Sequence, residues 1–178
     1  MAFGTRTQPI APFINGLGIC EAKPCYLNIL PDKTHWDEAQ SVLASFPEIK
    51  RSVTTTDFYD LPGFHGRLLL IPNQDGFIQE IDLSPSDSLT YIGSAILQLG
   101  DPCAAVRLGR DDLGLIYPGV SIITRMKKIG NYFVLRPTAP VIGANLFKRV
   151  ESCSDIGLDR TQADFRWHGF ARYAENGG

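Results

Sequence analysis

A helix-like segment followed by several short strand-like segments occurs twice along this chain, and that order constrains its fold most. Apolar side chains recur at helical spacing between residues 36 and 46 and again between 92 and 99. Thr34 and Thr90 precede these segments and are the predicted N-caps. Pro47 ends the first helix, and Gly100 ends the second.

Short runs rich in β-branched, aromatic and aliphatic residues follow each helix. The predicted strands are 53–59, 67–71 and 77–83 after the first helix, and 103–108, 113–117, 120–126, 132–135 and 141–149 after the second. Turn sequences separate them, such as Asp75-Gly76, Pro118-Gly119 and Gly130-Asn131. Such short connections predict antiparallel pairing.

The sequence therefore predicts an α+β fold of two tandem helix-then-antiparallel-meander modules, each a two-layer unit with one covered sheet face. The predicted boundaries are an irregular N-terminal arm over 1–24, a first module over 25–87, a second module over 88–174 and a frayed tail over 175–178.

Four cysteines are present, an even number that favours disulfides in a loop-rich chain. Three pairings are possible. We favour Cys20 with Cys25, because a short loop containing proline can close locally, and Cys103 with Cys153, because both fall in the second module. Disulfides in turn favour an extracytoplasmic protein, secreted or surface-anchored, whose leader is not present in this chain.

Composition and charge exclude several classes of protein. The chain of 178 residues is 44% hydrophobic and 20% charged, values typical of a globular domain. Its densest basic cluster is only Arg125, Lys127 and Lys128, which is too thin for the basic stripe that nucleic acid requires. No apolar run approaches the ~20 residues of a transmembrane span.

Three segments carry a resemblance to a known family. The first runs from Cys20 through Pro24-Cys25 and Pro31 to Thr34, and the others are Leu99-Gly-Asp-Pro102 and Trp167-His-Gly-Phe170. They resemble uncharacterised bacterial envelope lipoproteins that open with Cys-x-x-Pro-Cys-Trp-x-Gly-Ile-x-Pro-Gly-x-Thr. Here one extra residue precedes Pro24, and Tyr26 replaces the tryptophan.

The two capped helices are also similar to those of β-lactamase-inhibitor proteins and small outer-membrane-assembly lipoproteins. That resemblance implies a related fold and protein binding as the role, although a shared fold alone does not fix function.

Residues suited to catalysis or metal binding are scattered. His35, His65 and His168 stand apart, and the Cys20–Cys25 spacing fits a disulfide better than zinc. No calcium-type loop, nucleophile elbow or phosphate-binding glycine loop is present, so we expect no metal and no cofactor. Cys103 has no local sequence pattern of an activated nucleophile.

Aromatic side chains give the candidate binding residues, since Trp and Tyr dominate binding hot spots. A late cluster contains Trp167, His168, Phe170 and Tyr173, and a weaker one contains Phe58, Tyr59 and Phe64. The alternation of Phe165 and Trp167 favours a structural explanation of the late cluster, as a last strand closing the second sheet.

We therefore expect a non-catalytic extracytoplasmic or envelope-associated module that binds a protein or cell-envelope ligand through a sheet face or loop aromatics. The alternative is a small hydrolase-type enzyme using Cys103 or a histidine assembled by folding, which predicts a deep pocket holding these groups together. A third hypothesis, a structural assembly subunit, predicts a large apolar contact surface without a pocket.

Overall fold

The structure is a computed structural model, and it describes residues 16–21, 23–52, 58–61, 66–85, 90–148, 153, 169–170 and 172–174. These residues form two helices and thirteen strands. The helices are α1 (Trp36–Ala44) and α2 (Ile92–Leu99). The strands are β1 (Leu17–Cys20), β2 (Lys23–Tyr26), β3 (Lys50–Arg51), β4 (Phe58–Leu61), β5 (Gly66–Pro72), β6 (Ile78–Pro85), β7 (Ala104–Arg107), β8 (Asp112–Tyr117), β9 (Val120–Arg125), β10 (Lys127–Ile129), β11 (Tyr132–Val134), β12 (Val141–Phe147) and β13 (Arg172–Ala174).

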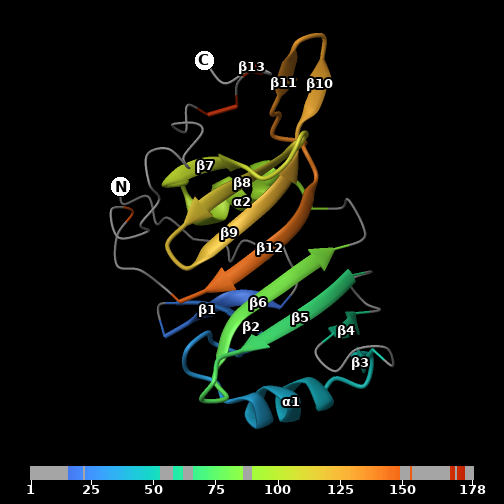
Figure 1. Cartoon of the computed structure of the whole chain (residues 1–178), viewed down its shortest axis with the longest axis vertical. Helices are drawn as coiled ribbons and strands as arrows, with labels where there is room; N and C mark the ends of the chain where they lie inside the picture. Colours follow the sequence, from blue (N-terminus) through green and yellow to red (C-terminus); the bar gives the residue numbers. More distant parts are fainter. Residues whose placement is uncertain are drawn as a thin grey trace, which may run out of the picture.

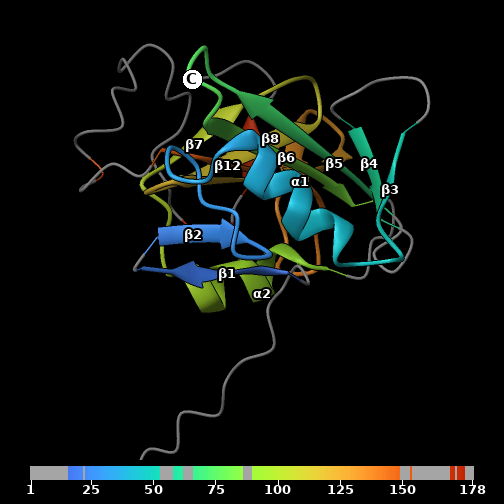
Figure 2. The ribbon, with the colours of Figure 1, turned by 90° about the horizontal axis from the view of Figure 1, so that it is seen from below.

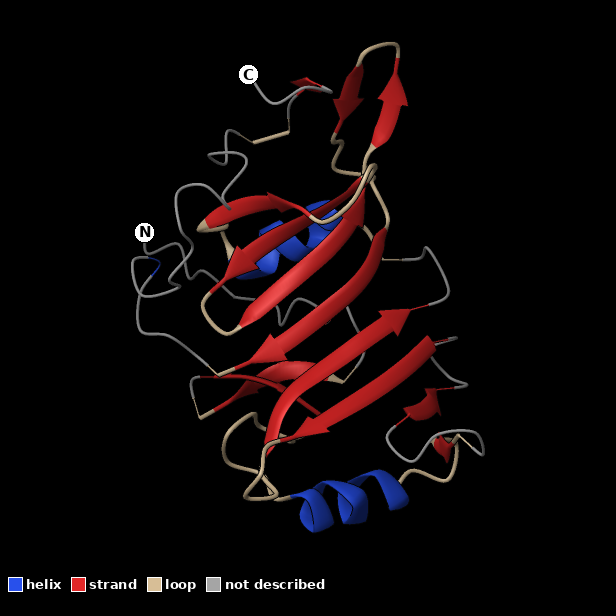
Figure 3. Ribbon diagram, viewed as in Figure 1, coloured by secondary structure: helices blue, strands red, loops and turns tan. Residues whose placement is uncertain are grey.

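One antiparallel sheet of eight strands dominates the molecule, in the order β3-β4-β5-β6-β12-β9-β8-β7 (Figures 1 and 3). The strands that follow α1 form one half of it, and strands that follow α2 form the other. The halves join where β6 pairs with β12, with Leu83 opposite Ala144 and Asp82 opposite Asn145. We call this pairing the seam.

The predicted fold class, an α+β protein of two separate helix-and-meander modules, is wrong. The protein is mostly β, and its two short helices accompany a single continuous sheet. Separate meanders would leave β6 and β12 as open edges with unpaired backbone groups. Pairing these two strands removes both edges. Most of the predicted strands are present in the sheet, but residues 53–57 of the predicted strand 53–59 lie outside the described residues.

The inner face of the sheet carries the core. Strand register places a continuous row of buried side chains across seven strands from β4 to β7. Its members are Tyr59, Leu68, Leu83, Ala144, Ile122, Leu115 and Ala105. Side chains from α1, α2 and the β1–β2 hairpin pack into the same cluster. Figure 2 shows α2 and the hairpin on one side of the sheet.

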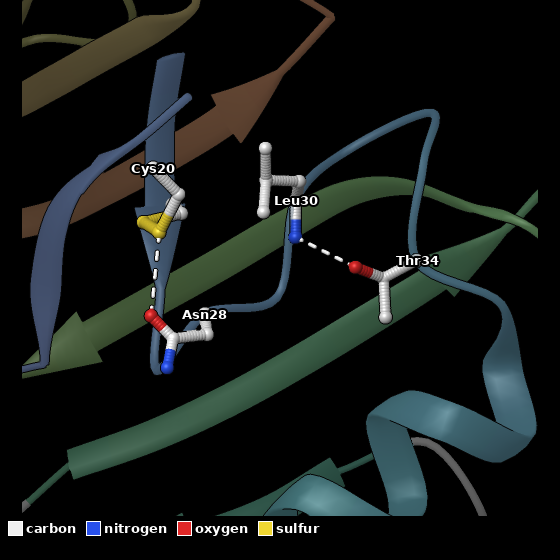
Figure 4. The surroundings of a disulfide bond; sticks show 5 residues. Cys20, Asn28, Leu30 and Thr34 are labelled. Atoms are coloured by element: carbon white, nitrogen blue, oxygen red, sulfur yellow. Dashed lines mark hydrogen bonds between the residues drawn. A yellow bond between two sulfur atoms is a disulfide. The ribbon is translucent and has the colours of Figure 1, made fainter. Parts of the chain in front are cut away.

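Both helices pack as their apolar stripes predict, but their N-caps lie one residue later than expected. His35 caps α1, with Nδ1 accepting from the Asp37 N–H at 3.4 Å. The buried Thr34 instead accepts from the Leu30 N–H at 2.9 Å and closes the preceding turn (Figure 4).

Tyr91 is the N-cap of α2, and backbone carbonyls of a distant loop satisfy the first N–H groups of that helix. Ile92 donates to the Ala139 carbonyl and Gly93 to the Pro137 carbonyl, each at 2.9 Å. A Cβ at Gly93 would lie 2.9 Å from that Pro137 oxygen, so this close approach requires glycine. Tertiary contacts therefore replace the predicted side-chain cap.

Both predicted disulfides are confirmed: Cys20 bonds to Cys25, and Cys103 bonds to Cys153. The first joins β1 to β2, a hairpin within a stretch expected to be irregular. Its Cys20 sulfur lies 3.5 Å from Oδ1 of Asn28 (Figure 4). The second anchors Cys153, which follows β12, to the start of β7 at the far edge of the large sheet.

We predict that Leu83→Ala, which removes a fully enclosed side chain beside the seam, lowers the free energy of unfolding by about 3 kcal/mol. Leu97→Ala on α2 is the matched control, because Leu97 is 79% exposed and its loss should change stability by less than about 0.5 kcal/mol. Urea unfolding measures both, and equal midpoints for the two variants would contradict the assignment of the core.

We also predict unequal contributions from the two disulfides. Removing Cys103–Cys153, which spans 50 residues, should destabilise the protein by about 4 kcal/mol on the chain-entropy argument. Removing Cys20–Cys25, which spans 5, should lower stability by about 2 kcal/mol. Paired Cys→Ser variants compared by thermal unfolding measure this difference, and a larger loss from the short bridge would contradict it.

Candidate functional site

The face of the large sheet opposite the core is the first candidate site, and we call it the outer face. In Figure 1 no described helix or strand lies in front of it. Its members alternate with core residues along each strand. They include Phe58, Asp60, Arg67, Leu69, Ile71, Glu80, Asp82, Ile116, Ser121, Ile123, Asn145 and Phe147.

Apolar side chains on the outer face are only half buried. Leu69 and Ile71 on β5, and Phe147 on β12, all keep part of their surface accessible. They flank the seam from both sides, because Leu69 pairs with Asp82 and Phe147 pairs with Glu80. A partly exposed apolar surface of this kind, with polar groups inside it, is typical of an interaction surface.

Two carboxyl groups occupy the middle of this apolar surface. Glu80 and Asp82 lie two residues apart on β6, so both point to the outer face, and Asn145 lies opposite on β12. Nδ2 of Asn145 donates to Oε1 of Glu80 at 3.4 Å. Oδ1 of Asp82 is shielded from solvent and has no hydrogen-bond partner among the described residues.

This environment disfavours a charge on Asp82. Burial is the main cause that raises its pKa, to about 6, and the charge of Glu80 and a hydrogen bond between the two carboxyls add to the effect. Neutral Asp82 is therefore favoured in the folded protein below that pH. Above it, the seam holds two like charges side by side, which is unfavourable for folding.

A shallow depression of about 410 Å³ beside α1 is the second candidate. His35, Trp36, Arg51, Pro72, Asn73, Gln74 and Gly76 line it. Its polar side chains already serve the local fold: His35 caps α1, and Oδ1 of Asn73 accepts from the N–H groups of Asp75 and Phe77 at 3.0 Å. The depression lies where the turn between β5 and β6 packs beside the start of α1, and this packing accounts for it.

The groups required by the enzyme hypothesis do not come together among the described residues. Cys103 is bonded to Cys153, so in the oxidised protein it has no thiol to act as a nucleophile. His35 lies 3.7 Å from Asp37, and both side chains are largely solvated. His65 and His168 lie outside the described residues. Within those residues, no group of three or more His, Cys, Asp or Glu is placed to hold a metal.

The predicted aromatic residues are separated by the fold. Phe58 lies on the outer face and is half exposed, whereas its neighbour Tyr59 points into the core. Phe170 is 40% exposed, and Tyr173 lies in β13 opposite Phe133.

Trp167, His168 and Phe64 lie outside the described residues, so their part in these aromatic clusters stays a prediction. Phe58 is the predicted aromatic residue that the described part of the structure places on the outer face.

Sequence reasoning missed Glu80, Asp82 and Asn145. The alternation Ile78-Gln-Glu-Ile-Asp-Leu83 does carry a signal, because it places acidic residues on the face opposite the aliphatic ones. Nothing local shows that β12 lies alongside β6, and it is this pairing that places Asn145 within hydrogen-bonding distance of Glu80.

Comparisons with known proteins give no assignment. No protein family model, no curated protein and no solved structure matches the chain. Within the described residues, no helix is both long and apolar enough to cross a bilayer. The two disulfides indicate an oxidising, extracytoplasmic environment.

We predict that Asp82→Asn stabilises the protein in a pH-dependent way. Between pH 3.8 and about 6, an unfolded aspartate loses its proton while folded Asp82 retains it, so the wild type loses stability as pH rises through this range. Asparagine does not ionise, so the advantage of the variant should grow over that range and then stay constant. We expect about 1 kcal/mol, reduced by solvent screening at this partly exposed carboxyl.

Urea unfolding at a series of pH values measures this advantage. Asp75→Asn, in the exposed turn between β5 and β6, is the control and should show no such growth. An Asp82→Asn advantage that is constant across the range, or that shrinks as pH rises, would contradict the proposed environment of Asp82.

Proposed function

We propose that this protein is a non-catalytic binding module of an extracytoplasmic compartment, secreted or anchored at the cell envelope. Its outer face binds a protein that presents a lysine or arginine surrounded by apolar side chains. The resemblance of its opening segment to envelope lipoproteins, and of its helices to inhibitor and assembly proteins, supports the same class of function.

The observation that carries this proposal is the pair Glu80 and Asp82 within the half-exposed apolar surface. Two carboxyls in this position reduce stability once both are ionised, and a neutral pair would fold better. Groups that reduce stability without a local structural benefit are characteristic of functional sites.

The chemistry of the site defines the partner. A cationic group of the partner placed beside Glu80 and Asp82 would relieve the repulsion between the two carboxyls. Leu69, Ile71 and Phe147 would then exclude water around this contact, as apolar neighbours do around interface hot spots. Because the contact needs ionised Asp82, binding should strengthen as pH rises through about 6.

The proposal is tested by affinity capture from the extracytoplasmic fraction of the source cells, with immobilised protein whose disulfides are intact. Asn145→Arg is the most informative variant, because its guanidinium would occupy the carboxyl pair and take the place of the partner. Leu69→Glu adds a third negative charge to the same surface. We expect a protein that the wild type recovers and both variants lose, with stronger recovery above pH 6 than below it.

Leu97→Ser is the control, since it changes an exposed apolar residue on α2, away from the outer face. Thermal unfolding shows whether each variant remains folded, and Asn145→Arg should be at least as stable as the wild type. Recovery of the same protein by Asn145→Arg and Leu69→Glu, or of no protein by the wild type, would overturn the proposal.

A further inference from the structure

The β10–β11 hairpin projects from one end of the molecule, beyond the end of the large sheet (Figure 1). It pairs with β13 to form a separate sheet of three strands. Gly130 and Asn131 form the turn at its tip, where Gly130 has a φ of 60°. This projecting element is away from the outer face and contributes nothing to the function proposed above.

The two faces of the hairpin differ. On one face Phe133 is fully buried, with the Arg107 guanidinium carbon 4.7 Å and the Lys128 ammonium 5.6 Å from its ring centroid. The Arg107 contact links the hairpin to β7 of the large sheet, whereas the Lys128 contact lies within the hairpin. The opposite face consists of Lys127, Ile129, Tyr132 and Val134, and we call it the hairpin face.

The hairpin face exposes apolar residues at its tip. Ile129 and Tyr132 pair across the strands and are 46% and 51% exposed. Lys127 is exposed two pairs further from the tip, opposite Val134. Apart from the Lys127 ammonium and the Tyr132 hydroxyl, this face has no side-chain group that forms hydrogen bonds, so it has few means of recognising a specific polar pattern.

Positive charge is concentrated around this hairpin. The sequence from 113 to 150 contains no Asp or Glu, although the whole chain has a net charge of −2. The fold brings Arg107, Arg125, Lys127 and Lys128 to this end, and Arg136 follows β11 by two residues. Lys148 lies beyond the far end of β12, 3.7 Å from Asp32, and does not contribute. Asp111 and Asp112 are the acidic residues beside the base of the hairpin, and Oδ1 of Asp112 is paired with Nε of Arg125 at 2.9 Å. The end of the molecule that carries the hairpin is therefore cationic.

We propose that the hairpin face docks this protein onto an anionic phospholipid surface. Ile129 enters the boundary of the acyl chains, and the Tyr132 ring takes the interfacial position that tyrosine prefers. Lys127 extends its ammonium to the headgroups while its alkyl stem stays apolar. Binding to a lipid surface requires neither a pocket nor a defined set of hydrogen bonds. A projecting apolar tip with basic residues around it is therefore suited to an anionic lipid surface.

Co-sedimentation of the full, disulfide-intact chain with lipid vesicles tests this proposal. Vesicles of phosphatidylglycerol and phosphatidylcholine in equal parts are compared with vesicles of phosphatidylcholine alone. We expect binding to the anionic vesicles only, weaker at about 0.15 M salt than at low salt. Lys127→Gln should weaken binding roughly fivefold and Ile129→Ser roughly five- to tenfold.

Matched controls are Lys50→Gln on β3 and Leu97→Ser on α2, which change an exposed lysine and an exposed leucine elsewhere. Both should bind the anionic vesicles as the wild type does, and thermal unfolding confirms that every variant is folded. The proposal is overturned if the wild type fails to bind anionic vesicles at low salt, or binds neutral vesicles equally well. Equal binding by Ile129→Ser and Leu97→Ser would also overturn it.

Discussion

The pairing of β6 with β12 is the interaction on which the rest of this structure depends. It converts two groups of strands into one sheet and closes two edges that would otherwise expose backbone hydrogen-bonding groups. The same four residue pairs build both faces. Leu83 with Ala144, and Ile81 with Leu146, complete the core, while Asp82 with Asn145, and Glu80 with Phe147, form the centre of the outer face.

This sharing couples stability to the proposed site. The alternation of side chains along β6 places Ile81 and Leu83 in the core only if Glu80 and Asp82 point outward. Shifting the register of β6 by one residue would turn its apolar side chains outward and its carboxyls into the core. Burial of the apolar side chains therefore fixes the positions of the carboxyls. The core therefore provides the rigidity that holds two like charges together at the seam.

Local features of this fold could be predicted from the sequence, and long-range features could not. The stripe containing Ala39 and Leu43 predicted a helix whose buried face is as expected, because helical periodicity is a local property. The cysteine pairs were predicted because one loop is short and contains a proline, and because the other two cysteines fall in the same predicted module. The predicted caps were one residue too early. The Thr34 hydroxyl accepts from the Leu30 N–H, and backbone carbonyls of the 137–139 loop accept from the first N–H groups of α2.

The seam and the site were missed for the same reason. Residues 82 and 145 are brought together by the packing of the whole sheet, and no turn or spacing in the sequence indicates that contact. Aromatic residues next to each other in the sequence also divide between the two faces of the sheet, since Tyr59 lies in the core and Phe58 reaches the outer face. A strand with alternating acidic and aliphatic residues was the better signal, although it gives no partner strand.

The unfavourable environment of Asp82 at the seam is the central claim, and titration of its carboxyl carbon by NMR tests it most directly. We predict a midpoint near pH 6 for Asp82 in the folded protein. A midpoint at the ordinary aspartate value of about 3.9 would show that Asp82 is well solvated and would contradict the account.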